Sequence, residues 1–219
     1  MLYVSLLLLS IHWAVVIYIN SSFLAQFVST ITISLLYIAG SLASLVCFFY
    51  MPAFLQSIGN FKLTILFTLL EISAVIGMAL AVSPFTASVY FLLHFILVPL
   101  LLFNLDVFIE DHVGSHEGNT GSIRGLYLSL LSLATAVGPL ITGSLVATHH
   151  SSFSIAYVVS ASVLLPFMAI IIVYFRTFKD PTYTLLSLTS MSEVFKENFD
   201  TRNIVVISFY LQLFFTWMV

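Results

Sequence analysis

The sequence predicts an all-α polytopic membrane protein, a bundle of six transmembrane helices followed by the start of a seventh. Composition is the first observation: 61% of the 219 residues are hydrophobic and only 7% are charged, too few to cover the surface of a water-soluble domain. The spacing of the charges is the second observation, because long gaps leave room for repeated bilayer crossings. No Asp, Glu, Lys or Arg occurs before Lys62, between Glu71 and Asp106, or between Arg124 and Arg176.

The apolar runs between these charges set the bounds of the expected helices. A helix of about 20 residues, rising 1.5 Å per residue, crosses the hydrocarbon core. The runs are continuously apolar, which excludes the alternating strands of a membrane β-barrel, and the first run lacks the basic residues that begin a secretory signal. The expected spans are residues 2–19, 31–50, 63–82, 86–108, 125–147 and 153–175, with a seventh beginning at residue 203.

The basic residues predict the orientation of the bundle. All six Lys and Arg residues fall in the connections after the second, fourth and sixth spans. Connections rich in Lys and Arg stay on the cytoplasmic side of a membrane. We therefore expect a cytoplasmic N-terminus, in an integral protein of the plasma (inner) membrane.

The longest cytoplasmic connection divides the chain into three parts. Residues 1–175 are the expected six-helix bundle, residues 176–202 a polar linker, and residues 203–219 the first part of a seventh transmembrane helix. Within the linker, Ser190 and Glu193 have the spacing of a capping box. This spacing predicts a short amphipathic helix on the inner membrane surface; a loosely ordered linker is the alternative.

The fifth span carries a pattern of small residues around a proline. The pattern consists of Gly125, Ala134, Gly138, Pro139, Thr142 and Gly143. It resembles the fifth-helix signature, often called the antiporter motif, of the major facilitator superfamily (MFS) of transporters, with Ala134 and Thr142 where that signature has glycine. The layout of six spans, a long cytoplasmic connection and a seventh span also resembles the N-terminal half of an MFS transporter.

The resemblance implies secondary active transport by alternating access. In that family two six-helix bundles rock against each other around a solute site near the bilayer midplane. The implied partners are a small-molecule solute, protons or another coupling ion, the lipid bilayer and a second, C-terminal six-helix bundle. Protons are the expected coupling ion, and the partial antiporter motif favours export.

Two further features bear on the resemblance. The apolar run that starts at Asn203 continues to Val219, so we expect the chain to be a fragment that stops inside the first helix of the second bundle; a naturally short half-transporter that dimerises is the alternative. The connection after the second span retains Gly59 and Lys62 of the family's cytoplasmic motif, whereas Gln56 stands where the family has an aspartate.

Three ionisable residues, His12, Glu71 and His94, fall deep inside expected spans. Such groups are costly in a membrane and face the bundle interior or water. In the resembled family the first and fourth helices line the central cavity, which favours the two histidines as substrate or proton contacts, since histidine changes charge near neutral pH. The alternative is a neutral histidine hydrogen-bonded between helices. Glu71, on the third span, is the third substrate or proton candidate, and a structural or protonated, helix-pairing carboxyl is its favoured alternative.

A second group of charges lies at the inner end of the fourth span. Asp106 and Glu110 are four residues apart and share one face of the expected helix, which Lys62 or Arg124 can approach. An ion-pair network that closes a cytoplasmic gate is one interpretation. Solvated charges at a helix end, which contribute little to stability, are the other.

Proline in the fifth span is expected to bend the helix and to free a carbonyl group one turn earlier. Pro139 removes one backbone hydrogen bond, and the hydroxyls of Thr135 and Thr142 are at hand to satisfy the freed carbonyl. We expect this bent, small-residue segment to be a surface on which a second bundle rocks.

Other classes of function lack sequence support. There is no basic patch for nucleic acid, and the sequence has no Walker A loop, GxSxG or nicotinamide fingerprint, so we expect no cofactor and no enzyme activity. A metal site at His112 and His116 is not expected because glycine stands between them and HExxH is missing. A structural or receptor-like membrane protein remains the alternative to a transporter, followed by an intramembrane enzyme.

Overall fold

The computed structural model describes residues 1–114, 120–148 and 153–183, and within this part all regular secondary structure is helical. The described residues up to Tyr183 form one packing unit. The linker helix expected at Ser190 and the seventh span expected from residue 203 lie outside the described residues. The helices are α1 (Leu2–Ile17), α2 (Asn20–Leu24), α3 (Thr30–Ile58), α4 (Asn60–Ala79), α5 (Pro84–Gly114), α6 (Thr120–Thr148) and α7 (Phe153–Tyr174).

Helices α3 to α7 are each long and apolar enough to cross a membrane, so this is a polytopic helical membrane protein. The expected first span is different, because α1 is apolar but has only 16 residues. The chain leaves the helix at Tyr18 and Ile19 and resumes as α2, a five-residue helix where a plain connection was expected. The first span is therefore a broken helix rather than the continuous helix expected over residues 2–19.

The helix ends follow local capping chemistry. Ser29 caps α3 by accepting a hydrogen bond from the Thr32 amide at 3.3 Å. Ser83 and Thr86 accept from each other's backbone amides at the start of α5, at 3.2 and 3.3 Å, in a reciprocal capping box. A single residue, Gly59, separates α3 from α4, and its φ of 88° is a conformation that favours glycine.

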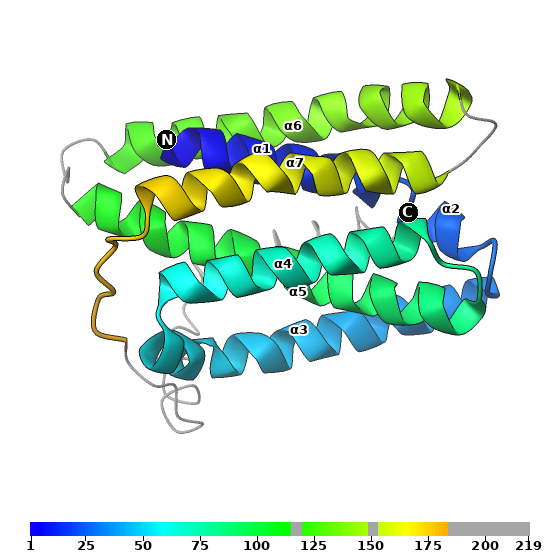
Figure 1. Ribbon diagram of the computed structural model, residues 1–219, viewed down its shortest axis with the longest axis horizontal. Helices are drawn as coiled ribbons and strands as arrows, with labels where there is room; N and C mark the ends of the chain where they lie inside the picture. Colours follow the sequence, from blue (N-terminus) through cyan, green and yellow to red (C-terminus); the bar gives the residue numbers. More distant parts are fainter. Residues whose placement is uncertain (115–119, 149–152, 184–219) are drawn as a thin grey trace, which may run out of the picture. The chain divides into compact units, whose positions relative to one another are not determined.

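The long helices pack side by side in an order that differs from their order in the chain. Helix α1 packs against α6 and α7, α7 packs against α4, α4 against α5, and α5 against α3. In Figure 1, α1 and α7 accordingly lie between α6 and the pair of α4 and α5. Among the five described helices long enough to span a membrane, α3 and α6 have the smallest buried share, and they are the two at the ends of this series.

A polar layer separates two apolar clusters inside the bundle. One cluster includes Leu6, Leu9, Phe67, Leu97 and Phe167. The other includes Val15, Val75, Met78, Phe91 and Tyr157. Along α1, α4 and α5 the chain passes from one cluster to the other through His12, Glu71 and His94. These three residues and Ser160 of α7, which contacts His12, are what we call the polar layer. Its four residues are almost completely buried.

The small residues of α6 divide between two faces of the helix. Ala134, Gly138 and Thr142 recur at every fourth position and are buried against α1. A Cβ atom on Gly138 would lie 2.5 Å from the backbone oxygen of Ala14, so only glycine permits this close approach. The Thr142 hydroxyl donates to the backbone oxygen of Val15 at 2.5 Å. This half of the expected rocking surface is used for packing within the bundle.

Pro139 frees the carbonyl oxygen of Thr135, and a neighbouring helix end satisfies it. The hydroxyl of Tyr18, at the break after α1, donates to that oxygen at 3.4 Å. The threonine hydroxyls expected in this role are engaged elsewhere, since Thr135 bonds to carbonyl oxygens of its own helix and Thr142 bonds to α1. The carbonyl freed in α6 is thus linked to the break in the first span.

The two faces of α6 predict different effects of the same substitution. Gly138→Ala should destabilise the bundle by about 1–3 kcal/mol, because the new methyl group meets backbone that cannot yield. Gly143→Ala, with nothing within 4 Å of its Cβ position, is the matched control and should be neutral. Thermal unfolding in detergent, followed by circular dichroism, measures both. Equal melting temperatures for the two variants would contradict this packing of α6 on α1.

Candidate functional site

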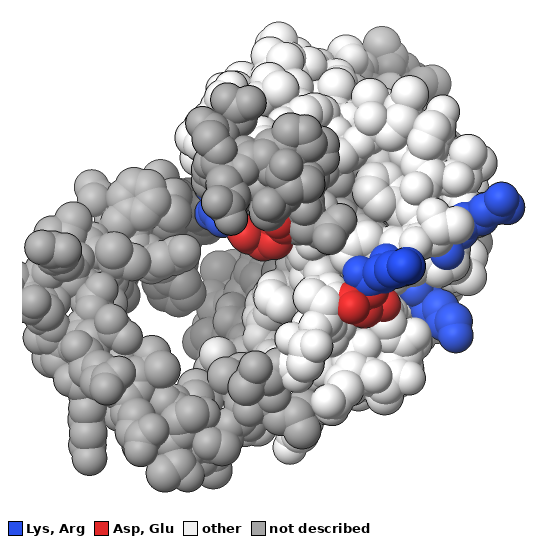
Figure 2. All heavy atoms as spheres, turned by 90° about the vertical axis from the view of Figure 1, so that its left-hand side faces the viewer, with Lys and Arg blue, Asp and Glu red and all other residues white. Residues whose placement is uncertain are grey.

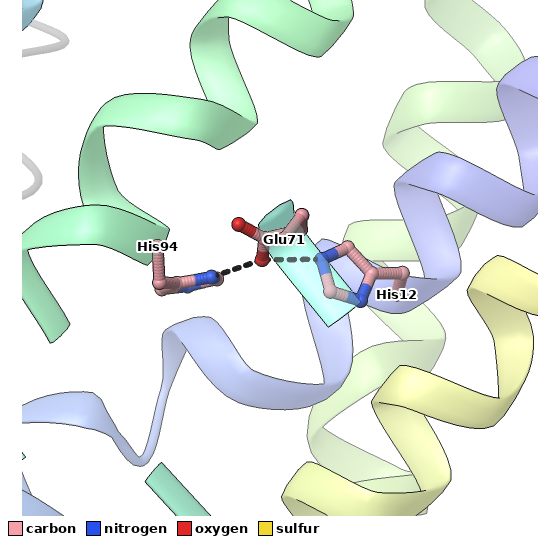
Figure 3. Close-up of side chains that lie close together, drawn as sticks. All are labelled: His12, Glu71 and His94. Carbon is pink, nitrogen blue, oxygen red and sulfur yellow. Dashed lines mark hydrogen bonds and ion pairs between the residues drawn. The ribbon is translucent and has the colours of Figure 1, made fainter. Parts of the chain in front are cut away.

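The candidate site is a cluster of His12, Glu71 and His94, which come from α1, α4 and α5 (Figure 3). Oε1 of Glu71 lies 3.0 Å from Nε2 of His12 and 2.5 Å from Nδ1 of His94. One carboxylate oxygen is therefore shared by two imidazole rings. The rings meet edge to face, with centroids 6.0 Å apart.

The cluster lies deep in the bundle and away from both helix ends. The side chains of His12 and Glu71 are 0% exposed and that of His94 is 3% exposed. Along α4, Glu71 lies about 16 Å from the first residue and about 12 Å from the last, at 1.5 Å per residue. Charged groups are expensive at such a depth and require partners, which the three residues provide for one another.

Residues of α7 orient His12. Its Nδ1 atom lies 3.1 Å from the backbone oxygen of Ser160 and 2.7 Å from the hydroxyl oxygen of the same residue. The Ser160 hydroxyl in turn donates to the backbone oxygen of His12 at 2.9 Å. The ring is held on both sides, by Ser160 at Nδ1 and by Glu71 at Nε2, which fixes its orientation.

Asn20 and Tyr157 complete the surroundings of His94. Nε2 of His94 lies 3.4 Å from the amide nitrogen of Asn20, the first residue of α2. The hydroxyl of Tyr157 donates to the amide oxygen of Asn20 at 3.0 Å. Asn20 is only 4% exposed, so the break between α1 and α2 carries a polar side chain into the bundle interior.

Glu71 has one carboxylate oxygen to spare. Its Oε2 atom is buried and has no hydrogen-bond partner among the described residues. A buried acceptor without a donor is costly in an apolar interior. Such an atom can accept a hydrogen bond from a water molecule or share a proton with a titrating neighbour, so the cluster has chemical capacity beyond the contacts it makes.

The three residues also have the composition of a metal site, but their spacing is that of hydrogen bonds. Their nearest ligand atoms all lie within 4.8 Å of one another. Two ligand atoms at about 2.0–2.1 Å from one ion are normally separated by roughly 3 Å or more. The 2.5 Å separation between Glu71 and His94 is shorter than that, which favours shared protons over a bound ion.

The sequence analysis predicted that these residues lie deep in their spans, but it did not predict that they contact one another. His12 and His94 were expected to face the interior, and they do so together with Glu71, which was expected to pair helices. Three polar partners were missed: Asn20, Tyr157 and Ser160. Asn20 had one signal, a lone amide at the edge of the first apolar run. Ser160 and Tyr157 have no signal that separates them from other serines and tyrosines in spans.

A second group of charges gathers at one end of the bundle (Figure 2). Arg124 of α6 forms an ion pair with Glu110 of α5, and both side chains are more than half exposed. Asp106 of α5 is hydrogen-bonded to Tyr127 of α6. Lys62 is in no ion pair within the described residues. These contacts join α5 to α6, and the exposed pair contributes little free energy because water screens it.

Near the same end, the segment after α7 caps α4. Oδ1 of Asp180 accepts a hydrogen bond from the backbone amide of Asn60 at 2.8 Å and from the hydroxyl of Tyr183 at 2.6 Å. Burial, with the Asp180 carboxylate beside it, raises the pKa of the Tyr183 hydroxyl. A Cβ atom on Gly59 would lie 2.8 Å from Asp180, so the glycine also makes room for this cap.

Asp180→Ala should therefore loosen the start of α4. Loss of a helix cap costs about 0.5–2 kcal/mol, and the melting temperature in detergent should fall accordingly. Amide hydrogen exchange in the first turn of α4 should also become faster. Lys179→Ala, an exposed neighbour, is the control. Asp180→Asn keeps an acceptor oxygen and should restore part of the loss; no difference among the three variants would contradict the capping role.

Comparisons with known proteins leave the chain without an assigned family. No protein-family model, curated protein or solved structure matches it. The functional conclusion therefore depends on the described residues alone, and above all on the buried cluster.

Proposed function

We propose that the protein is a secondary active transporter that moves a small solute across the membrane in exchange for, or together with, protons. The observation that carries this proposal is the cluster of His12, Glu71 and His94, buried between the two apolar clusters. Ionisable groups placed at this depth mark ion or substrate pathways in membrane proteins. A purely structural bundle needs none of them, because apolar side chains of similar volume would pack at lower cost.

Protons are the coupling ion that the side chains favour. Histidine is the side chain whose charge changes near neutral pH, and here two histidines share one carboxylate oxygen at hydrogen-bond distance. A proton can therefore be gained or lost within the cluster by small changes in its surroundings. The cluster joins three helices, so a change of charge alters contacts between α1, α4 and α5.

The broken first span supports a transport cycle. Discontinuous helices beside a buried ion or substrate site are a recurring feature of secondary transporters, because the break lets backbone and side chains respond to the bound species. Here the break at Tyr18 and Ile19 lies directly before Asn20, which contacts His94. The interruption of the helix is thus adjacent to the buried cluster.

We further propose that these helices work as one of two bundles, in the manner of an MFS transporter. Large apolar side chains are exposed along α3 and α6, and Gly125 and Gly143 of α6 have nothing within 4 Å of their Cβ positions. A second six-helix bundle and lipid would together cover these faces. Export remains the proposed direction, on the strength of the partial antiporter motif.

A shallow groove gives this bundle a place for its share of a solute site. The groove has a volume of about 370 Å³ and is lined by Tyr18 and Ile19 at the break and by α6 from Pro139 to Ala147. Small-molecule sites of this size are common, and they are mostly apolar with a few polar groups. The Tyr18 and Thr142 hydroxyls are the polar groups here, which suits a small, largely apolar solute.

The proposal predicts proton movement that depends on solute. The protein is reconstituted in lipid vesicles that enclose a pH-sensitive dye, and a panel of small solutes is added. We expect at least one solute to produce proton flux in the native protein and little flux in Glu71→Gln, because the amide cannot exchange a proton with the histidines. Ser73→Ala is the matched control on α4: its hydroxyl is exposed and bonds only to its own helix, so flux should persist.

Two results would count against this function. Solute-dependent flux of equal size in the native protein and in Glu71→Gln would show that the cluster has no role in coupling. The second result has two parts: the native protein moves no proton with any solute, and Glu71→Gln folds normally, with unchanged size on gel filtration. Together they would favour a non-transporting membrane protein.

A further inference from the structure

The contacts of His12 favour a proton on Nδ1 in either charge state of the cluster. This nitrogen lies 3.1 Å from the backbone oxygen of Ser160, and a carbonyl oxygen can only accept. The Ser160 hydroxyl gives its own proton to the backbone oxygen of His12, so the hydroxyl oxygen is a second acceptor for the Nδ1 proton at 2.7 Å. Helix α7 therefore fixes the tautomer of His12.

A further proton lies between His12 and Glu71. If His12 were neutral and Glu71 ionised, the lone pair of Nε2 would face the lone pairs of Oε1 at 3.0 Å, and two acceptors do not form a hydrogen bond. The proton is either on Nε2 of an imidazolium or on Oε1 of a neutral acid. In both cases the proton position between His12 and Glu71 is filled.

His94 has the ring nitrogen that can still accept a proton. Its Nδ1 atom donates to Glu71 at 2.5 Å. Its Nε2 atom faces the amide nitrogen of Asn20, which is a donor, so Nε2 is an acceptor without a proton. Tyr157 holds the amide in this orientation by donating to its oxygen. The cluster then has no net charge, with one shared proton balancing one carboxylate.

We propose that His94 is the exchangeable proton site of the cluster and that Asn20 is the positioning residue that responds to its charge. This inference rests on the proposed proton-coupled function. A proton taken from water forms a new N–H bond at Nε2, and a donor amide cannot satisfy that N–H. A rotation of the Asn20 side-chain amide by about 180° places its oxygen opposite the N–H of His94. The amide nitrogen of Asn20 then donates to the hydroxyl oxygen of Tyr157. When the proton leaves, both bonds reverse.

Few titratable groups lie near His94, and the contribution of each long helix can be stated. Within the described residues, α6 adds no charge to this layer because Arg124 lies at its exposed end. Among the described residues of the polar layer, Glu71 is the sole acidic group, so a proton on His94 raises the net charge of the layer and makes the Asn20 oxygen an important acceptor. The titratable groups are Glu71 of α4, His12 of α1, Tyr157 of α7 and Tyr37 of α3, and Asn20 of α2 is a neutral polar neighbour. Tyr37 packs edge-on to Phe91 and Phe95 of α5.

Nitrogen NMR of the histidine rings tests the assignment. The chain is labelled with 15N-histidine and placed in lipid nanodiscs, and the proton on each ring nitrogen is followed as a function of pH. His12→Gln and His94→Gln assign the signals. We expect His12 to keep its Nδ1 proton throughout the pH range in which the protein is folded. His94 should show a proton on Nδ1 alone at high pH and gain one on Nε2 as the pH falls.

Substitutions of Asn20 test the positioning role. Asn20→Leu leaves the protonated ring without an acceptor, so the midpoint of His94 protonation should move to lower pH by about one unit. Asn20→Asp supplies a carboxylate and should move the midpoint to higher pH by a similar amount. Asn104→Leu is the control, because it removes a buried amide from the same helix as His94, ten residues away, and should leave the midpoint unchanged.

Opposite outcomes are distinguishable. The inference is overturned if His12 rather than His94 titrates, or if the Asn20 variants leave the midpoint unchanged or move it in the same direction. If Asn20→Leu does not fold, the native titration and Asn20→Asp still decide. Solute-dependent proton flux without titration of His94 would refute this inference alone, whereas titration of His94 without any solute-dependent flux would refute the proposed function alone.

Discussion

One carboxylate oxygen, Oε1 of Glu71, lies within hydrogen-bond distance of two histidines, and the interior of the bundle is organised around it. Through this atom α4 is joined to α1 and to α5, and Ser160 extends the join to α7. The apolar clusters on either side can pack against any neighbour of suitable shape, but the hydrogen bonds of the polar layer require its residues to lie at the same depth. The buried polar side chains thus determine which arrangement of the helices forms, and the apolar residues stabilise that arrangement.

The same layer is connected to the parts of the chain that depart from regular helix. Asn20, which contacts His94, follows directly after the break in the first span. Tyr18, at that break, donates to the carbonyl that Pro139 frees in α6. A side chain at one irregular site therefore satisfies the backbone carbonyl freed at the other, as an apolar environment requires. The contact between Asn20 and His94 thus lies within two residues of Tyr18, which contacts α6.

Sequence alone predicted the helices well because their signal is local. Five of the six expected spans are present as long apolar helices. Helix α3 continues eight residues past its expected end at residue 50, and the depths of His12, Glu71 and His94 followed from counting residues. The faces of the helices could not be predicted in this way. Helices that are apolar on every side carry no polar face to orient them. The contact of three side chains from α1, α4 and α5 therefore could not be predicted from the sequence.

The same limit explains the misreadings in α6 and in the first span. Gly138 and Gly143 look equivalent in the sequence, yet one touches the α1 backbone and the other faces open space. The break at Tyr18 contains no proline or glycine. It is accompanied by long-range contacts of Asn20 with His94 and Tyr157, and no local pattern encodes such contacts.

The central claim is that the buried cluster couples protons to a solute, and not merely that it holds helices together. The most direct measurement compares two activities of His94→Gln in vesicles: exchange of labelled for unlabelled solute, and accumulation of solute driven by a pH gradient. We predict that the variant keeps exchange and loses accumulation, because the solute path is intact while the proton step is gone. Equal loss of both activities in a folded protein, or full retention of both, would contradict the account.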